Sequence, residues 1–378
     1  MPPVPRPGAN PYLETVTRHA PAGQVGRHPL AQGPPRAKGQ TAAFGLLSPA
    51  ARARLRSRPL PAWTVPMLAT LTDERFADAA WIFERKLDGE RCLAFGDEEV
   101  RLLSRNRRLL NGAYPEIVEA LERQSARFVL DGEIVAFSGR ATSFARLQGR
   151  MGLDDPARAR ATGIPVFYYV FDILWLDGQD TTRLELLDRK RLLEAAIEFE
   201  APLRYSAHRV GDGERFYRQA CRSGWEGLIA KRAASPYVHR RSPDWLKFKC
   251  VAEQELVIGG WTDPEGGRTD FGALLVGYYD GAALVYAGKV GTGYDEATLR
   301  ALGARLRRLA RLTSPFARGN PPAAGARWVE PVLVVEVGFS EWTSAGKLRH
   351  PRYLGLRPDK PAREVVRETP GPARRRRP

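Results

Sequence analysis

The sequence has little cysteine and no long apolar run. Only Cys92, Cys221 and Cys250 occur among 378 residues, widely separated and without a CxxC pair. This spacing argues against a disulfide framework and a structural zinc site, so we expect buried free thiols. No apolar run reaches the roughly 18 residues of a membrane span, and MPPVPRPGANPY lacks the apolar core of a secretory signal. We therefore predict a cytoplasmic protein without membrane association.

Acidic residues are the scarcer charged type. The chain has 43 Asp and Glu against 59 Lys and Arg, which gives a net charge of +16. Such an excess favours a polyanionic partner. However, residues 1–61 hold nine Lys/Arg against one acid and residues 361–378 hold six against two, so the two tails supply +12 of that charge. Charge alone therefore does not indicate nucleic-acid binding by the body, and the tails are either solvated or add salt-sensitive DNA affinity.

Composition divides the chain into four parts. Residues 1–61 contain 12 of the 30 prolines, which predicts a mostly disordered Pro/Arg-rich extension with a short helix over 42–55 that docks on the body. Residues 62–250 mix strands and helices, whereas residues 251–362 consist of glycine-punctuated strands with one helix, as in a small OB-fold β-barrel. Residues 363–378 form a basic tail. The fold class is therefore α+β, with antiparallel sheets followed by a barrel.

Periodicity and turn residues give the expected elements. The helices are expected at 115–123, 186–199, 214–222 and 295–310. We expect Asp-Gly turns at 88–89 and 131–132, and strands on either side of them. The strands are expected at 81–86, 91–95, 100–104, 127–130, 133–137, 166–174, 227–231, 245–248, 255–261, 273–279, 284–290 and 332–337.

Polar residues gather at the ends of these strands. ERKLDGER over 84–91 places Lys86 before an Asp-Gly turn, a pattern also common in exposed hairpins. LDGEIV over 130–135 repeats the Asp-Gly-Glu order, and EGLIAKR over 226–232 places a carboxylate and a lysine at opposite ends of a strand. WLKFK over 245–249 projects Lys247 and Lys249 from one face, because side chains alternate along a strand. Four such groups in order indicate a common site.

With these groups and with SRN at 104–106, VFDIL at 170–174 and LRHPRYLGLRPDK at 348–360, the chain resembles the covalent nucleotidyltransferases. The resemblance is to ATP-dependent DNA ligases of the bacterial non-homologous end-joining (ligase D) type, and it covers about residues 62–362. It implies a nucleotidyltransferase (adenylation) domain over 62–250 and an OB-fold domain over 251–362. It also implies that Lys86 attacks ATP and carries AMP to the 5′-phosphate of a DNA break.

Attack by a lysine requires the neutral amine. We expect Lys247, Lys249 and a divalent cation to depress the pKa of Lys86, while the two lysines hold the α-phosphate.

The resemblance also implies roles for the remaining site residues. Asp88 would assist sealing, and Glu133 and Glu226 would bind Mg²⁺ or Mn²⁺, or the ribose. Phe171 would stack on adenine or simply pack, since both need a flat apolar face, and Glu84 would accept a hydrogen bond from the adenine amino group. The cationic residues expected to contact ribose, phosphate or pyrophosphate are Arg91, Arg105, Arg349, Arg357 and Lys360.

Other functions share part of this pattern. An RNA ligase or a capping-type guanylyltransferase has the same lysine and two-domain plan, and an inactive DNA-binding or end-bridging protein would keep the fold. The RHPR and RPDK pairs favour a DNA ligase, and a scaffold has no physical need for this set of lysines and acids. The expected partners are nicked or broken double-stranded DNA, a Ku-like end-binding protein and separate polymerase and phosphoesterase modules. We expect a monomer associated with the nucleoid.

Overall fold

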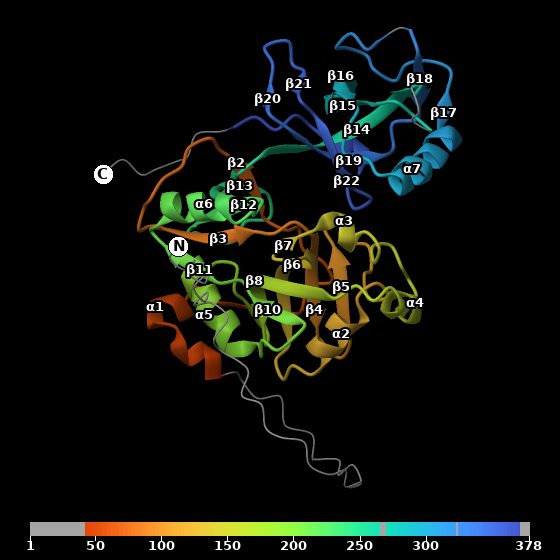
Figure 1. Ribbon diagram of the computed structural model, residues 1–378. Coiled ribbons are helices and arrows are strands. Elements are labelled where there is room, and N and C mark those ends of the chain that lie inside the picture. The colour runs from red at the N-terminus through yellow and green to blue at the C-terminus, as the bar shows by residue number, and fades with distance from the viewer. Residues whose placement is uncertain (1–41, 265–269, 323, 371–378) are drawn as a thin grey trace, which may run out of the picture. The chain divides into compact units, whose positions relative to one another are not determined.

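The computed structural model describes residues 42–264, 270–322 and 324–370. Residues 1–41 and 371–378, which hold most of the predicted extension and half of the basic tail, lie outside these ranges. The α+β architecture expected for residues 62–250 is confirmed, as is the strand-rich second domain (Figure 1). No helix of the described ranges is long and apolar enough to cross a membrane.

The first domain contains a sheet of eight strands. Its order is β1-β9-β8-β6-β4-β5, with β10 beside β8 and β7 beside β6. The strands are β1 (Arg56–Ser57), β4 (Glu90–Gly96), β5 (Val100–Ser104), β6 (Phe128–Ser138), β7 (Ala141–Thr142), β8 (Val166–Leu176), β9 (Gln179–Asp180) and β10 (Leu203–Tyr205). The helices that accompany this sheet are α2 (Pro115–Glu122), α3 (Phe144–Leu147), α4 (Pro156–Ala161) and α5 (Leu186–Ala196).

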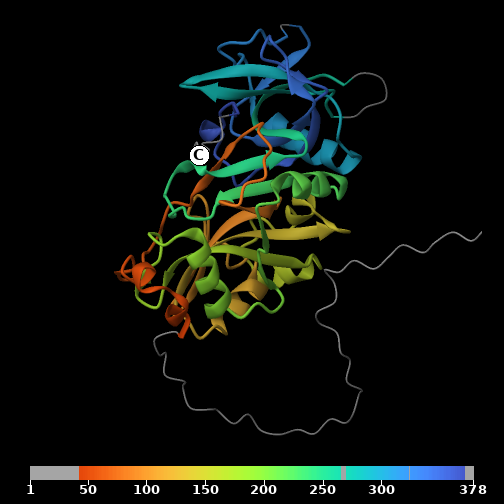
Figure 2. The same ribbon diagram turned by 90° about the vertical axis from the view of Figure 1, so that its left-hand side faces the viewer.

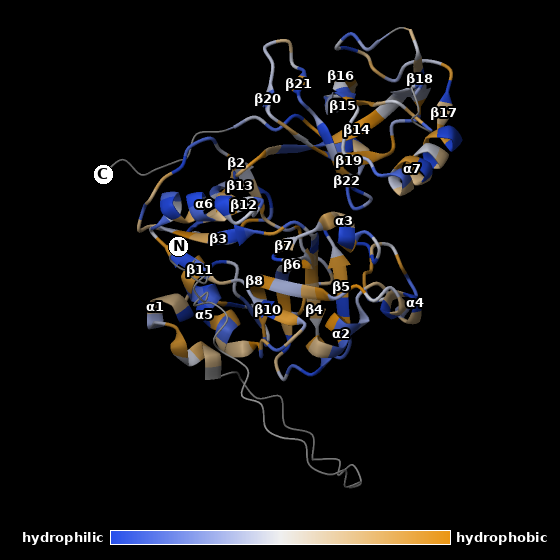
Figure 3. Ribbon diagram, in the orientation of Figure 1, coloured by the Kyte–Doolittle hydropathy of each residue, from blue (hydrophilic) through white to orange (hydrophobic). Residues whose placement is uncertain are grey.

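A second sheet of the same domain has the order β11-β3-β12-β13-β2. Its members are β2 (Leu68–Leu71), β3 (Trp81–Lys86), β11 (His208–Val210), β12 (Gly227–Arg232) and β13 (Arg241–Lys249), and α6 (Gly213–Arg222) packs on it. Phe95, Phe171 and Trp245 come from the two sheets and join one buried cluster, which fixes the sheets against each other. The hydropathy of β3 changes from apolar to polar along its length, so its final residues reach the polar site (Figure 3).

Both predicted Asp-Gly turns are wrong. Strands β3 and β4 belong to different sheets, so Asp88-Gly89 connects two sheets instead of forming a hairpin. A Cβ at Gly89 would lie 2.1 Å from the Ile134 carbonyl oxygen, which shows how closely the backbone of β6 approaches this connection. Asp131-Gly132 lies inside the continuous strand β6, at a shift in its register with β8. The sequence shows the small residue but not which chain segment lies against it.

The second domain consists of a sheet of seven strands and a hairpin. In the sheet, β14 pairs with β15, β18 and β19, and α7 begins at a cap where Asp295 accepts from the Thr298 amide at 2.7 Å. This agrees with the predicted small barrel carrying one helix. Its elements are β14 (Ala252–Thr262), β15 (Leu274–Asp280), β16 (Ala283–Val290), α7 (Glu296–Arg308), β17 (Ala310–Arg311), β18 (Ala326–Val329), β19 (Val334–Phe339), β20 (Glu341–Trp342), β21 (Leu348–Arg349), β22 (Arg352–Leu356) and the 3-10 helix η2 (Ala362–Glu364).

The start of the described chain is folded onto the first domain. The 3-10 helix η1 (Ala42–Leu46) and α1 (Pro49–Arg52) each contribute a buried alanine to the main core, Leu47 between them is also buried there, and η1 contacts α5 (Figures 1 and 2). The predicted docking of residues 42–55 on the body is confirmed, but two short helices, one of them a 3-10 helix, replace the single helix that was expected. The prediction that residues 42–61 belong to a disordered segment is wrong, because these apolar side chains find a partner surface that composition does not reveal.

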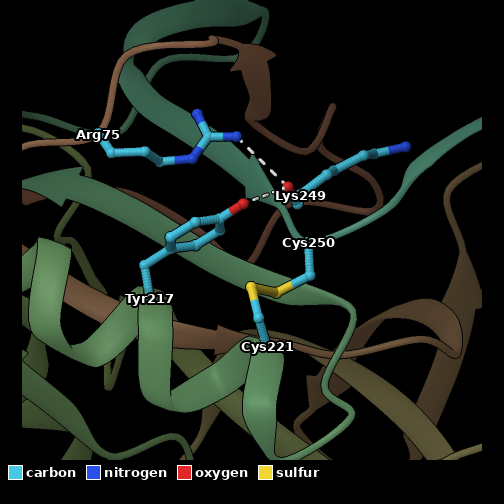
Figure 4. Close-up of a disulfide and its surroundings, with 5 residues drawn as sticks. All are labelled: Arg75, Tyr217, Cys221, Lys249 and Cys250. Carbon is cyan, nitrogen blue, oxygen red and sulfur yellow. Dashed lines mark hydrogen bonds between the residues drawn. A yellow bond between two sulfur atoms is a disulfide. The ribbon is translucent and has the colours of Figure 1, made fainter. Parts of the chain in front are cut away.

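The cysteine prediction is partly wrong. Cys221 on α6 and Cys250 after β13 form a disulfide (Figure 4). Cys92 is the expected buried free thiol. The disulfide lies next to the carbonyl of Lys249, which accepts hydrogen bonds from Arg75 at 3.3 Å and from Tyr217 at 2.9 Å. The two cysteines are 29 residues apart in the sequence. Only the packing of α6 on the sheet brings them together.

Candidate functional site

The register of three strands brings the predicted lysines together. In the β3–β12 pair Lys86 lies opposite Gly227, and in the β12–β13 pair Gly227 lies opposite Lys249. Lys247 is two residues earlier on the same face of β13. The three lysines line one pocket, together with Glu226, which directly precedes β12.

Lys86 forms an ion pair with Glu226 in which its ammonium donates a hydrogen bond to Oε1. Burial works to lower the pKa of Lys86, but Glu226, Asp88 and Glu253 more than compensate, so its pKa is raised above the usual value. These carboxylates therefore outweigh the depression expected from Lys247 and Lys249, and the depression expected from a divalent cation stays a prediction. The cause is the carboxylate of Glu226, which accepts a hydrogen bond from the amine.

Several carboxyl groups surround Lys86 and are difficult to ionise together. Burial raises the pKa of Asp88 to about 6, with a further contribution from Glu226. Burial also raises the pKa of Glu133 to about 8 against the opposing effect of Arg91, and that of Glu253 to about 8 with a contribution from Glu226. Bringing a cation to such a group would favour the ionised carboxylates.

The predicted metal ligands fit a divalent cation in one specific respect. Glu226 Oε2 is buried and has no hydrogen-bond partner among the described residues, although Oε1 binds Lys86. An unpaired buried carboxylate oxygen is costly unless a ligand satisfies it. Over the described part of the chain, no group of three or more His, Cys, Asp or Glu side chains has the arrangement of a complete metal site. Glu133 and Glu226 would therefore supply only part of a coordination shell.

An aromatic and cationic surface lies across the pocket. The Phe171 ring is 8% exposed, and the Arg91 guanidinium lies 4.6 Å from its centroid. Arg91 is held there by two hydrogen bonds to Asp131, both 2.6 Å, and by one to the Met67 carbonyl at 3.2 Å. Phe171 packs edge-on against Trp245, so packing is confirmed, and adenine stacking by its ring stays a prediction.

Glu84 is buried in a closed ionic cluster. Its two carboxylate oxygens accept hydrogen bonds from Lys190 and Lys231, both at 2.8 Å, and Ser206 donates to it at 3.3 Å. Burial would raise the pKa of Glu84, but the two lysines lower it below the usual value. Burial lowers the pKa of Lys231 to about 8, with Lys190 adding to this effect. The Glu84 carboxylate already accepts three hydrogen bonds, and the predicted hydrogen bond from the adenine amino group to it stays a prediction.

The second domain contributes the other predicted cations. Arg357 pairs with Glu336 and Asp359, each at 2.9 Å, and Lys360 pairs with Glu255 at 3.2 Å. All of these residues line the same pocket as Lys86. Arg105 lines it too.

Arg349 is the one predicted site residue that the structure does not bring to this pocket. It lies in the β20–β21 hairpin, where it is exposed and pairs with Glu341 at 2.5 Å. The motif LRHPRYLGLRPDK divides between this hairpin and β22, because His350 adopts a positive φ of 48° and the chain turns there. Arg349 and Arg357 therefore lie in different environments despite their closeness in sequence.

Sequence reasoning missed three residues that line the pocket, Lys231, Glu255 and Glu368, and two that act on its residues from outside the lining, Glu253 and Lys190. Glu253 and Glu255 alternate on β14, and that period of two was a usable indication of two acids on one face. Lys231 belongs to the EGLIAKR motif, but the motif gave no expected function for it. For Lys190 on a polar helix, and for Glu368 after the last motif, no local pattern indicated a site.

The fold and this pocket define a two-domain nucleotidyltransferase, in which a half-buried lysine lies beside further lysines and arginines. The family "ATP dependent DNA ligase domain" matches residues 66–249, and "ATP dependent DNA ligase C terminal region" matches residues 267–360. A solved structure of mycobacterial DNA ligase D complexed with ATP and MES is 37% identical, covers 81% of this chain and 98% of its own, and has a TM-score of 0.59. The chain belongs to the ATP-dependent DNA ligase family.

Two curated relatives are multifunctional proteins. The multifunctional non-homologous end joining protein LigD of Pseudomonas aeruginosa is 39% identical over 340 residues, which is 85% of this chain and 39% of that protein. The corresponding DNA repair protein LigD of Mycobacterium tuberculosis is 40% identical over 312 residues, which is 80% of this chain and 40% of that protein. The chain thus spans about two fifths of the length of these relatives.

Proposed function

We propose that the protein is an ATP-dependent DNA ligase that seals a 5′-phosphate to a 3′-hydroxyl through an AMP attached to Lys86. The observation that carries this proposal is the position of Lys86, which lines one pocket with Lys247 and Lys249 and bonds Glu226, whose second carboxylate oxygen has no hydrogen-bond partner in the described residues. This is the environment that a lysine nucleophile for a phosphate needs, and the family match supports it.

Lys86 must lose a proton before it attacks the α-phosphorus of ATP. In the structure its ammonium already donates to Glu226, so that carboxylate is placed to receive the proton as the new N–P bond forms and pyrophosphate leaves. Lys247 and Lys249 would hold the α-phosphate and spread its developing charge. Lys360 and Arg357, from the second domain, would hold the departing pyrophosphate, and Arg349 would join them only after a movement that brings its hairpin to the site.

A divalent cation at Glu133 and Glu226 would neutralise charge on the triphosphate, and Mg²⁺ or Mn²⁺ suits two carboxylates that leave positions for substrate oxygens. On the aromatic side, Phe171 would stack on the adenine and Glu84 would accept from its amino group. Arg91 and Arg105 would contact ribose or phosphate. In the last step, Asp88 would assist the 3′-hydroxyl in displacing AMP.

The proposed substrate is nicked or broken double-stranded DNA. The names of the relatives place them in non-homologous end joining, so we propose end joining or repair as the setting for this chain. A Ku-like end-binding protein would recruit it, and separate polymerase and phosphoesterase modules would prepare the ends. We propose that it acts as a cytoplasmic, nucleoid-associated monomer.

The decisive experiment mixes the protein and Mg²⁺ with α-labelled ATP or α-labelled GTP and looks for an acid-labile covalent label. We expect label from ATP in the wild type and none in Lys86→Ala. The matched control is Lys289→Ala, which removes an exposed lysine. Label from GTP, or label that survives in Lys86→Ala, would overturn the proposal. Sealing of nicked DNA compared with nicked RNA then identifies the substrate.

A further inference from the structure

The chain returns to the pocket after the last predicted motif. Val365 is buried in the second core of the barrel domain, and its carbonyl accepts from the Tyr279 amide at 2.7 Å. Beyond it, the buried side chain of Gln254 holds the backbone from two sides. It donates to the Val366 carbonyl and accepts from the Glu368 amide, both at 3.1 Å. These hydrogen bonds therefore fix the backbone position of residues 365–368.

The fixed backbone places the Glu368 side chain beside the two lysines of β13. Its Oε1 accepts from Lys247 Nζ at 2.5 Å, and its Oε2 lies 3.9 Å from Lys249 Nζ. Only 18% of the side chain is exposed, and Oε2 has no hydrogen-bond partner within the described ranges. Glu368 also lines the pocket that contains Lys86.

A carboxylate between two lysines occupies the kind of position that a phosphate group would take. Both are anions that accept hydrogen bonds from ammonium groups. Under the proposed function, Lys247 and Lys249 hold the α-phosphate of ATP, so this inference rests on that function. The carboxylate and a phosphate cannot share the two lysines, because two like charges at this distance repel each other strongly in a buried site.

We propose that Glu368 is a displaceable internal anion that competes with the phosphates of ATP for Lys247 and Lys249. The bound nucleotide has to displace the carboxylate, while the anchors at Val365 and Gln254 keep the segment close. The competition lowers the apparent affinity for ATP without changing the chemistry at Lys86.

The charge state of Glu368 supports the competition. Burial alone would raise its pKa, but Lys247 and Lys249 lower it to about 2. The carboxylate is therefore ionised at neutral pH. In the same structure, Lys249 also donates to the Glu253 carbonyl at 2.7 Å, so displacement of Glu368 leaves that lysine anchored and ready for a phosphate.

The test compares the wild type with Glu368→Gln and Glu368→Ala. The control is Glu330→Gln, which removes an exposed carboxylate of the same domain that pairs with Arg311 at 3.5 Å. Calorimetry measures the Kd of α,β-methylene ATP, which cannot transfer AMP, with Mg²⁺ present. If Glu368 covers the lysines about nine tenths of the time, its loss makes binding about tenfold tighter. The control should leave the Kd unchanged.

A second measurement follows the rate of covalent labelling against ATP concentration. We expect the half-saturating ATP concentration to fall by about the same factor in both Glu368 variants, and the maximal rate to stay within about twofold of wild type. Unchanged or weaker analogue binding in Glu368→Gln and Glu368→Ala would overturn the competition. Absence of label in the wild type would instead overturn the proposed function, since the binding measurement does not depend on catalysis. A single cooperative unfolding transition in each of the four proteins checks that each is folded.

Discussion

Two ionic clusters contribute residues to the same pocket and differ in how their polar atoms are satisfied. In the Glu84 cluster, one carboxylate is bonded by Lys190 and Lys231, and neither oxygen is left over. In the Lys86 cluster, one lysine faces Asp88, Glu133, Glu226 and Glu253, three of these acids have raised pKa values, and one Glu226 oxygen has no partner in the described residues. A closed cluster stabilises the fold, whereas an open one has free capacity for a ligand.

Glu84→Gln should have the largest effect on stability. It leaves two buried cations without their shared anion, and breaking such a pair costs about 4 kcal/mol of unfolding free energy. Urea unfolding at pH 7 measures this loss. The control is Glu119→Gln, which breaks an ion pair with Arg160 on the exposed surface and should cost less than about 1 kcal/mol. Equal losses in the two variants would show that the Glu84 cluster does not hold the domain together.

The disulfide ties the chain just after Lys249 to helix α6, so it supports the open cluster covalently. The disulfide closes a loop of 29 residues and so restricts the unfolded chain. Its removal should therefore lower the free energy of unfolding by about 3 kcal/mol. The double variant Cys221→Ser, Cys250→Ser should unfold at lower urea than the oxidised wild type. A reductant should lower the urea midpoint of the wild type to that of the double variant, and it should not change the midpoint of the double variant. A double variant as stable as the wild type would show that the bond is not formed in solution.

Glu226→Gln should separate activity from stability. The amide removes the acceptor of the Lys86 proton and an oxygen that would bind a cation, so covalent labelling from ATP should fall about 100-fold. The unfolding free energy should change by less than about 1 kcal/mol, because the change also relieves repulsion with Asp88 and Glu253. A stability loss as large as that of Glu84→Gln, with labelling intact, would reverse the assignment of the two clusters.

The smallest expected effect is the pH dependence of the stability that Glu84 contributes. The lysines lower the pKa of Glu84 below its ordinary value of 4.5, so its ionised form stabilises the folded state above that pH. This contribution disappears as the pH falls through the lowered pKa, where the folded carboxylate also becomes protonated. The stability difference between wild type and Glu84→Gln should therefore shrink below pH 4.5, by about 1.4 kcal/mol for each unit by which the pKa is lowered. A difference independent of pH down to the acid unfolding of the protein would contradict this.

Local patterns predicted most of the elements but not their partners. The strands at 81–86 and 100–104 have the predicted bounds, because alternation and turn residues are local properties. The predicted hairpin after Lys86 failed, since an Asp-Gly pair permits a turn without specifying which sheet the next strand joins. The predicted cluster of Lys86, Glu226, Lys247 and Lys249 is present in one pocket.

The sequence by itself predicted the pocket position of Lys86, the motif residues near it and the two-domain order, because each depends on residues close together in the chain. The tertiary structure decided what those residues touch. It joined Glu84 to Lys190 and Lys231, 106 and 147 residues away, and Lys247 to Glu368, 121 residues away. It also formed the disulfide and placed Arg349 outside the pocket. These contacts depend on strand register and on the return of distant segments, which no local periodicity encodes.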